Sequence, residues 1–354
     1  MSKFRFFDGH NDLLYRLWMA KDQRISLWRD GKDAGHLDLE RMQQSGYCGA
    51  FFAIWVPDQF SSMQDIENLM NQPQFDIPLP KPIDHSYAQS VALSQASALI
   101  EMERLAPESF SICKTKSDLT ASLSDGRVAA VMHMEGAEAI GQNLDQLFLW
   151  HKLGLRSLGP VWSRPTVFGN GVPFAFPSTP DRGEGLTPLG KDLVRLCDQL
   201  RIIIDLSHLN EKGFDDVFKQ SNRPMVATHS NAHTKTAAAR NLTDRQLHII
   251  AETRGIVGLN FATAFLRIDG QKNTDTDWDD ICRHMDHLLS ILGEDHVALG
   301  TDFDGAVVPD IIGNVCGLPK FAEMMVKKGY GAELVHKITS ANWINFLQET
   351  LPDN

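Results

Sequence analysis

Residues 201–230 read RIIIDLSHLNEKGFDDVFKQSNRPMVATHS, and they contain a pattern that recurs along the chain. A short apolar run (201–206) is followed by a longer polar stretch and then by a second apolar run (224–228). Strands that are buried on both faces of a parallel sheet have nearly continuous apolar sequences of this kind. The segment therefore predicts two parallel strands joined by a longer connection.

The same alternation predicts eight strands in the whole chain. They are expected at residues 3–8, 49–55, 128–135, 155–161, 201–206, 224–228, 255–260 and 296–300. Helical periodicity or helix start signals occupy residues 84–105, 186–200 and 243–253. About eight strand–helix units fit a closed barrel better than an open doubly wound sheet of five or six strands. We predict an α/β fold, a (β/α)8 TIM barrel in which residues 1–354 form a single metal-dependent hydrolase domain.

Two longer segments interrupt the alternation. Residues 57–82 are rich in proline, glutamine and asparagine, and residues 159–185 are rich in glycine and proline. Both follow predicted strands, at the end of the barrel where such enzymes carry their active sites. They are either surface connections or the wall of a substrate pocket. Because long ordered loops in compact domains tend to be functional, we favour the pocket wall.

The composition limits the classes of partner. Lysine and arginine total 34 and aspartate and glutamate total 45 among 354 residues, which gives a formal net charge of −11. Phosphate backbones and anionic lipids would repel such a chain, so no nucleic-acid partner is predicted. No stretch approaches the ~20 apolar residues of a membrane helix, and a polar motif begins at Asp8, which leaves no room for a signal peptide. Five scattered cysteines without CxxC spacing favour reduced thiols. We predict a cytoplasmic protein that does not bind membranes.

Histidine, aspartate and glutamate gather at the ends of five predicted strands. These residues are His10 and Asp12, Glu135, His208, His229 and Asp302. Closure of a barrel brings its strand ends to one rim, where barrel enzymes perform their chemistry. Imidazole and carboxylate ligands suit Zn²⁺, and three of each exceed what one tetrahedral ion uses. The sequence therefore predicts a centre with two metal ions, of the kind that share a carboxylate and a water molecule.

Other catalytic motifs are absent from the sequence, which has no GxSxG elbow, P-loop or HExxH. His133 lies two residues before Glu135 and is interpreted as a packed histidine. Asp8 and Asp205 precede candidate ligands and are interpreted as groups that orient the histidines. A further set of histidines is expected to be solvated: His36, His85, His248, His284, His287 and His336.

Six ordered motifs resemble one family along almost the whole chain. They are FFDGHNDLLYRL (6–17), CGAFFAIW (48–55), VMHMEGAE (131–138), IDLSH (204–208), PMVATHSNAHTKTAAARNLTD (224–244) and GTDFDG (300–305). They are similar to the membrane (renal) dipeptidases, which are binuclear zinc peptidases of the amidohydrolase superfamily. Ordinary amidohydrolases begin with HxH, whereas this chain has HND and a glutamate where the metals need a bridge. The resemblance implies a metallopeptidase that hydrolyses dipeptides, and a homodimer.

The resemblance also implies a role for each motif residue. His10 and Asp12 would hold one Zn²⁺, His208 and His229 the other, and Glu135 would bridge the two. Asp302 would lie beside the bridging water, and Arg240 would face the substrate carboxylate. The family contacts its substrate with a histidine after the fourth strand. This chain has LGPVWSRP there, with Trp162 in the corresponding place, which departs from the family pattern.

The expected chemistry follows from two adjacent cations. A water molecule that two Zn²⁺ share loses a proton near neutral pH, and Asp302 would accept that proton and relay it to the leaving amine. The main alternative is another amidohydrolase reaction on the same metals, with N-acyl amino acids, lactones or phosphoesters as substrates. A third possibility, a binding protein without catalysis, predicts the loss of at least one ligand, and the set is complete.

Overall fold

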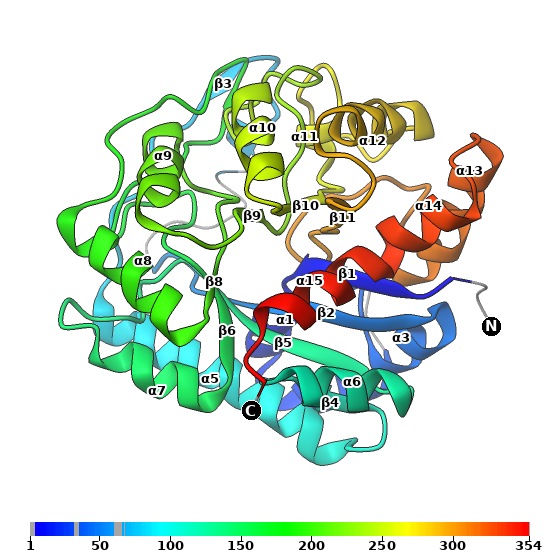
Figure 1. Cartoon of the computed structure of the whole chain (residues 1–354), viewed down its shortest axis with the longest axis horizontal. Helices are drawn as coiled ribbons and strands as arrows, with labels where there is room; N and C mark the ends of the chain where they lie inside the picture. The colour runs from blue at the N-terminus through cyan, green and yellow to red at the C-terminus, as the bar shows by residue number, and fades with distance from the viewer. Residues whose placement is uncertain (1–3, 32–34, 60–65, 67, 354) are drawn as a thin grey trace.

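Eight parallel strands within the described part of the chain form a nearly closed barrel. The computed structural model describes residues 4–31, 35–59, 66 and 68–353. Neighbouring strands follow the order of the chain from β1 to β10 and β11, and β11 pairs with β1 again. Between β8 and β9, the Leu206 amide donates to the Val226 carbonyl at 2.8 Å. Helices surround the strands in the order of the colour ramp (Figure 1). The predicted TIM barrel is confirmed.

All eight predicted strands are present: β5 has the predicted bounds, β2 is longer, β1 is shifted, and the other five are shorter. They are β1 (Phe6–Asn11), β2 (Tyr47–Trp55), β5 (Val128–Glu135), β6 (Leu155–Gly159), β8 (Ile203–Ile204), β9 (Val226–Ala227), β10 (Ile256–Leu259) and β11 (Val297–Leu299). Because β1 ends at Asn11 rather than at residue 8, His10 lies within the strand. A further strand, β4 (Phe110–Ile112), pairs with β5 and was not predicted.

The α-helices of the described residues lie between successive strands, except for the last three, which follow β11. They are α1 (Leu13–Met19), α2 (Arg24–Asp30), α3 (Leu39–Ser45), α5 (His85–Leu105), α6 (Lys116–Ser124), α7 (Asp145–Leu153), α8 (Pro188–Leu200), α9 (Glu211–Gln220), α10 (Asp244–Glu252), α11 (Thr263–Leu266), α12 (Trp278–Leu292), α13 (Leu318–Lys327), α14 (Ala332–His336) and α15 (Asn342–Thr350). None of the helices in the described residues is long and apolar enough to cross a membrane.

Capping side chains explain where the three predicted helices begin. Asp84 accepts a hydrogen bond from the amide of Tyr87 and starts α5. Thr187 caps α8, whose first residue is Pro188. Proline is tolerated at this position because a backbone N–H in the first turn would have no partner within the helix. Thr243 and Gln246 form a reciprocal capping box at α10. These signals are local, so the sequence was sufficient to place the helices.

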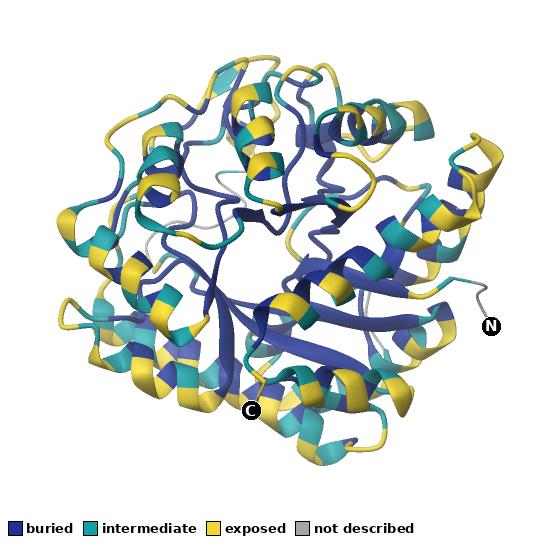
Figure 2. Ribbon diagram, viewed as in Figure 1, coloured by how far each residue is buried: buried dark blue, intermediate teal, exposed yellow. Residues whose placement is uncertain are grey.

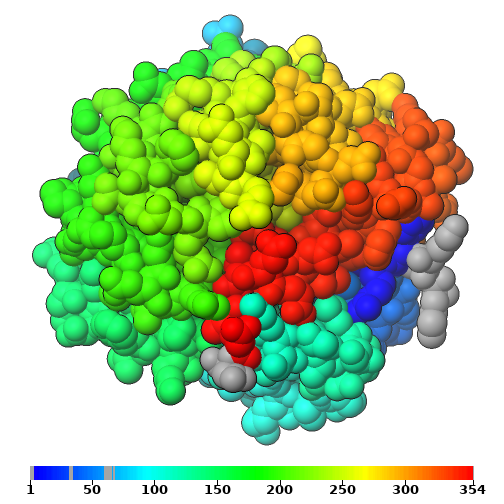
Figure 3. All heavy atoms as spheres, viewed as in Figure 1, coloured from blue at the N-terminus to red at the C-terminus, as the bar shows by residue number. Residues whose placement is uncertain are grey.

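The barrel interior at the end opposite the site is filled by apolar side chains. One residue from each of several strands contributes to it: Phe7, Phe51, Val131, Ile203, Val226, Ile256 and Ala298. Trp343 of α15 packs among them and donates its indole N–H to the Leu299 carbonyl at 2.7 Å. The eight barrel strands are buried throughout, and the exposed residues lie on the outer faces of the helices and in the loops (Figure 2). Atoms of the C-terminal segment cover the middle of the face seen in Figure 3.

The two long loops pair with each other. Strand β3 (Phe75–Asp76), from the first loop, is antiparallel to β7 (Ala175–Phe176), from the second. This pair was not predicted, because each strand has two residues and its partner lies about one hundred residues away. Residues 60–65 and 67 of the first loop lie outside the described residues. Both loops contribute to the cavity described below, as the pocket-wall interpretation predicted.

Candidate metal and active site

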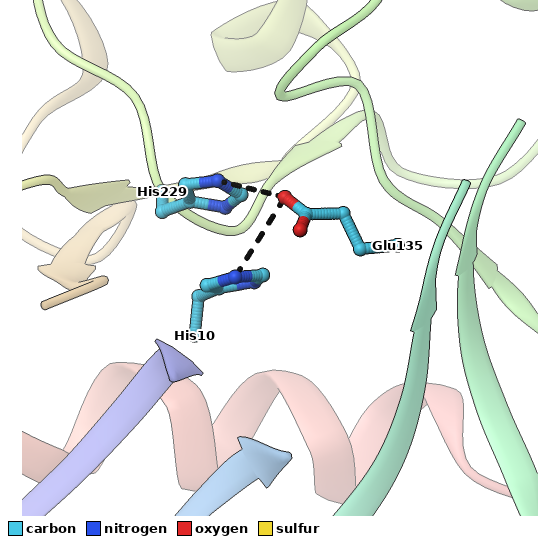
Figure 4. Close-up of side chains that lie close together, drawn as sticks. All are labelled: His10, Glu135 and His229. Carbon is cyan, nitrogen blue, oxygen red and sulfur yellow. Dashed lines mark ion pairs between the residues drawn. The ribbon is translucent and has the colours of Figure 1, made fainter. Parts of the chain in front are cut away.

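The barrel brings the predicted ligands together at the carboxyl ends of its strands. His10 lies in β1, Asp12 follows it directly, and Glu135 is the last residue of β5. His208 and His229 lie on the segments that follow β8 and β9. The side chains of His10 and His229 point toward the Glu135 carboxylate (Figure 4).

One carboxylate oxygen is the centre of this cluster. Oε1 of Glu135 lies 3.0 Å from Nε2 of His208, 3.3 Å from Nε2 of His229 and 3.7 Å from Nε2 of His10. The Nε2 atoms of His208 and His229 are 3.3 Å apart, and the rings of His10 and His229 are stacked with centroids at 3.7 Å. Three imidazoles that meet one carboxylate in this way form a compact set of ligand atoms.

A second set overlaps the first at His10. The ligand atoms of His10, Asp12 and Asp302 lie within 4.8 Å of one another, and His10 Nε2 is 3.3 Å from Asp12 Oδ2. The ligand atoms of His10, Glu135 and His229 satisfy the same 4.8 Å criterion. All of these residues are buried. Two overlapping groups of nitrogen and oxygen donors fit the donor set that divalent zinc prefers.

The protonation of this cluster shows the effect of burying so many polar groups. Burial raises the pKa of Glu135 well above its usual value and lowers the pKa values of His208 and His229 well below theirs. Burial also opposes the charged form of His10, but Glu135 and Asp12 together raise its pKa to about 10. Buried carboxylates and imidazoles are otherwise costly, and a cation among them would offset that cost. The residues therefore fit a metal centre.

Hydrogen bonds orient two of the histidines with Nε2 toward Glu135. The Thr228 hydroxyl donates to Asp205 Oδ2 at 2.7 Å, so at 2.9 Å it accepts from the Nδ1–H of His229. Ser163 Oγ lies 2.9 Å from Nδ1 of His208. Such contacts fix the tautomer that leaves Nε2 free as a ligand. Asp205 thus orients His229 through Thr228, in the role predicted for it.

Asp8 acts differently from the prediction. Its carboxylate accepts hydrogen bonds from the amide and hydroxyl of Thr301 at 2.7 and 2.6 Å and from the Tyr47 hydroxyl at 2.8 Å. It accepts a hydrogen bond from the backbone amide of His10 at 3.3 Å, and Nδ1 of that histidine has no hydrogen-bond partner among the described residues. Asp8 therefore fixes the strand ends that carry the site, while the His10 ring is positioned by its contact with Asp12 and its stacking on His229.

Asp302 lies at the edge of both the cluster and the cavity. Its backbone is left-handed, with φ of 61°, and its amide donates to the His10 carbonyl at 3.1 Å. Asn260 Nδ2 donates to Asp302 Oδ2 at 2.9 Å. Burial raises the pKa of the Asp302 carboxyl above its ordinary value. The sequence analysis missed Asn260. The signal was available, because Asn260 is the polar residue at the end of the seventh predicted strand.

Arg240 is buried next to the candidate ligand His229. Its Nη1 donates to Ser230 Oγ at 2.9 Å and its Nη2 to the His229 carbonyl at 3.0 Å, whereas its Nε has no partner among the described residues. The guanidinium carbon lies 5.8 Å from the centre of the Phe265 ring. Burial lowers the pKa of Arg240 to about 10, which still leaves a cation at neutral pH. Arg240 is therefore a fixed positive charge next to the cluster.

A cavity of about 220 Å³ opens beside the cluster. Its lining includes the carboxylates of Asp12, Glu135, Asp302 and Asp304, the ring of His208, and several aromatic side chains. Trp162 is one of these, 6% exposed, with its ring centroid 5.8 Å from that of His208. Trp162 therefore lies where the sequence analysis expected a substrate contact.

The remaining candidate residues are structural or peripheral. His133 is buried, with Nδ1 2.9 Å from Ser157 Oγ and Nε2 3.5 Å from Asp205 Oδ2, as a packed histidine would be. Asp304 lies 3.1 Å from Arg16 Nε and accepts the His36 amide at 2.6 Å. The prediction that His284 is solvated was wrong, because this residue of α12 is buried and its Nε2 lies 3.0 Å from the Leu266 carbonyl oxygen.

Comparisons with known proteins agree on one description. A model of the membrane dipeptidases, peptidase family M19, matches residues 1–351. A metallo peptidase of Rhodobacter sphaeroides, solved with a phosphinate mimic of the dipeptide L-Ala-D-Ala, is 53% identical, covers 98% of this chain and 99% of its own, and has a TM-score of 0.96. A solved metallo peptidase of family M19, dipeptidase AC, is 52% identical with the same coverage and TM-score. Dipeptidase tcpJ of Claviceps purpurea is 26% identical over 97% of this chain and 76% of its own length.

Proposed function

The chain belongs to the membrane dipeptidase family, peptidase family M19, and we propose on this premise that it hydrolyses dipeptides at a centre of two zinc ions. As a member of that family it is a metallo-dipeptidase, a hydrolase that acts on peptide bonds and needs a metal. The identity of the metal, the number of ions and the role of each residue are the proposal. We also propose that residues 1–354 act as one domain.

The observation that carries the proposal is the position of Glu135. One of its oxygens lies within 3.7 Å of imidazole nitrogens from three different strand ends, a geometry suited to a carboxylate that two ions share. The proposed ligands are His10, Asp12, Glu135, His208 and His229. Two bound zinc ions would acidify a water molecule and polarise the peptide carbonyl.

Other groups in or next to the cavity would perform the remaining tasks. Arg240 would bind the α-carboxylate of the substrate, because a planar guanidinium can donate two parallel hydrogen bonds to a carboxylate. Asp302 would accept a proton from the attacking water and return it to the nitrogen of the leaving amino acid. Asn260 would keep the Asp302 carboxylate pointed at the reacting atoms through its 2.9 Å hydrogen bond. Trp162 would exclude solvent in place of the histidine that the family pattern has.

The direct test combines metal analysis with peptide hydrolysis. We expect purified protein to contain close to two zinc ions per chain and to hydrolyse simple dipeptides. A chelator should abolish this hydrolysis, and added zinc should restore it. The amide of the same dipeptide, which lacks the free carboxylate, should be a poor substrate, and an N-acyl amino acid tests the alternative substrate class. Hydrolysis that persists after complete metal removal would contradict the proposal.

A further inference from the structure

Five aromatic side chains form a continuous arc along the wall of the cavity. They are Tyr15, Trp55, Trp162, Phe174 and Phe265, in that order. Successive ring centroids are 4.9, 5.2, 5.5 and 6.2 Å apart. The rings come from α1, the end of β2, the loop after β6 and α11, so the arc joins segments that are far apart in the sequence.

The two ends of the arc lie near groups of opposite charge. Phe265 is 5.8 Å from the guanidinium carbon of Arg240. At the other end, Tyr15 is close enough to Asp12 that, after burial, the carboxylate raises the pKa of the phenol. If Arg240 holds the substrate carboxylate, the amino-terminal residue of a dipeptide points toward the Tyr15 end. Its side chain would then contact Trp55 and Trp162.

A buried guanidinium outside the cavity holds the Trp162 part of this wall. Arg164 is fully buried, and its carbon Cζ lies 5.4 Å from the centre of the Trp162 ring. Nε and Nη2 donate to Glu138 Oε1 at 2.9 and 2.7 Å, and Nη2 also donates to the Val56 carbonyl at 2.8 Å. Arg164 therefore connects the loops after β2, β5 and β6, the loops that follow Trp55, Glu135 and Trp162.

The backbone around Trp162 is equally constrained. The Trp162 carbonyl oxygen lies where a side chain on Gly171 would begin, 1.9 Å from the position of its Cβ, so only glycine fits there. With the backbone fixed, the orientation of the indole depends on what packs against its face. A cation over the face of tryptophan is attracted to the ring, and the fork of Arg164 is itself fixed by Glu138 and Val56.

We propose that Arg164 is a positioning residue that sets the side-chain specificity of the site by holding Trp162 against Trp55. The wall so formed selects dipeptides with a large apolar side chain on the amino-terminal residue. This inference rests on the proposed dipeptidase function and on Arg240 as the carboxylate clamp. Because Glu138 neutralises Arg164, the effect on the substrate passes through the indole and not through a free charge.

The first test compares Leu-Ala with Gly-Ala, which differ only in the amino-terminal side chain. We expect the wild-type protein to favour Leu-Ala in kcat/KM, and Arg164→Met to reduce that preference about tenfold, mainly through KM for Leu-Ala. Metal content, measured separately, should not change. The double variant Glu138→Leu/Arg164→Met removes both buried charges and so guards against misfolding, and it should show the same loss of preference.

Arg156 provides a matched control. It is a buried arginine at the other end of β6 and donates to the carbonyls of Lys114 and His151 at 2.7 and 2.9 Å, away from the cavity. Arg156→Met should change stability without changing the preference between the two dipeptides. If Arg164→Met leaves the preference unchanged, as Arg156→Met should, Arg164 is merely structural and the inference is wrong.

A second measurement does not depend on turnover. In protein labelled with 5-fluorotryptophan, the ¹⁹F resonance of Trp162, assigned by its loss in Trp162→Phe, should shift or broaden in Arg164→Met and in the double variant. It should stay unchanged in Arg156→Met. If the wild type hydrolyses neither dipeptide, the proposed function fails, and this resonance alone decides whether Arg164 holds the ring. An unmoved resonance in both Arg164 variants would overturn the inference.

Discussion

Asp302 has a backbone conformation that residues other than glycine rarely adopt, and this conformation positions its side chain in the site. Its φ of 61° is in the left-handed region, which costs about 1–3 kcal/mol and recurs at functional sites. Gly305 follows in the same turn, and a Cβ there would lie 2.0 Å from Asp12 Oδ2 and 2.9 Å from Asp302 Oδ1. The turn therefore packs the carboxylates of Asp12 and Asp302 against Gly305, where a side chain would not fit. We infer that the strain is tolerated because it aims Asp302 at the cavity.

Replacing Asp302 with asparagine tests its role as the proton acceptor. Asp302→Asn keeps the shape of the side chain but cannot accept a proton, so kcat should fall by roughly 10²–10⁴ with both metals retained. The matched control is Asp304→Asn, two residues further on, whose carboxylate is engaged by Arg16 and the His36 amide. That variant should lose less than about tenfold. A comparably small loss in Asp302→Asn, with metal content intact, would assign Asp302 a structural role.

The contribution of Arg240 to kcat/KM should depend on whether the substrate carries a free carboxylate. Arg240→Ala should lose about 2–5 kcal/mol of transition-state stabilisation with a free dipeptide, because the carboxylate is left unpaired in the site. With the corresponding dipeptide amide, already a poor substrate, it should lose little. The measurement is kcat/KM for both substrates in both proteins. Equal losses on the two substrates would show that Arg240 supports the fold around Ser230 and His229 instead of binding the carboxylate.

At the level of elements, local sequence signals were sufficient to predict the barrel strands and three of the helices. They were insufficient to predict the contacts between the loops. The apolar runs predicted all eight barrel strands. Helical periodicity predicted α5, and helix start signals predicted α8 and α10, to within a residue or two. The pairing of β3 with β7 was invisible, since it depends on contacts across about one hundred residues. Ser163, Thr228, Asn260 and Arg164 were missed for the same reason. Each makes a hydrogen bond to a residue on another segment (His208, Asp205, Asp302 and Glu138, respectively), and one sequence does not reveal such partners.

The end of β9 allows a test of how a supporting residue controls the metal. Thr228→Val removes the hydroxyl between Asp205 and His229 but keeps the shape of the side chain. Zinc affinity should fall about 10–100-fold, which competition with a chelator of known affinity would measure. Thr339→Val, at another buried threonine whose hydroxyl is 3.5 Å from the His336 carbonyl, should leave the affinity unchanged. Equal affinities in the two variants would rule out the proposed relay.

For the whole molecule, the proposed metal centre lies beside the gap between β8 and β9, where the barrel closes. The described residues pair β8 with β9 by little more than the bridge between Asp205 and Val226 and the bond from Leu206. His208 and His229 follow these two strands, whereas His10 and Glu135 belong to β1 and β5, which do not border the gap between β8 and β9. Metal ions bound by these four residues would connect the weakly paired strands β8 and β9 to β1 and β5. The cytoplasmic location and the homodimer stay predictions.

Removing the metal should therefore weaken the whole barrel. Zinc at about 100 times its dissociation constant contributes roughly 2.7 kcal/mol to folding, so a chelator should lower the Tm by several degrees and added zinc should restore it. Glu135→Gln serves as the comparison. Without metal, burying a carboxylate is costly, so this variant should be at least as stable as the wild type. With zinc, the order should reverse, because an amide lacks the negative charge and the second oxygen with which a carboxylate could bind two ions. Calorimetry of the two proteins, each with chelator and with zinc, measures this crossing. An equal rise in Tm on adding zinc to both would show that Glu135 is not the shared ligand.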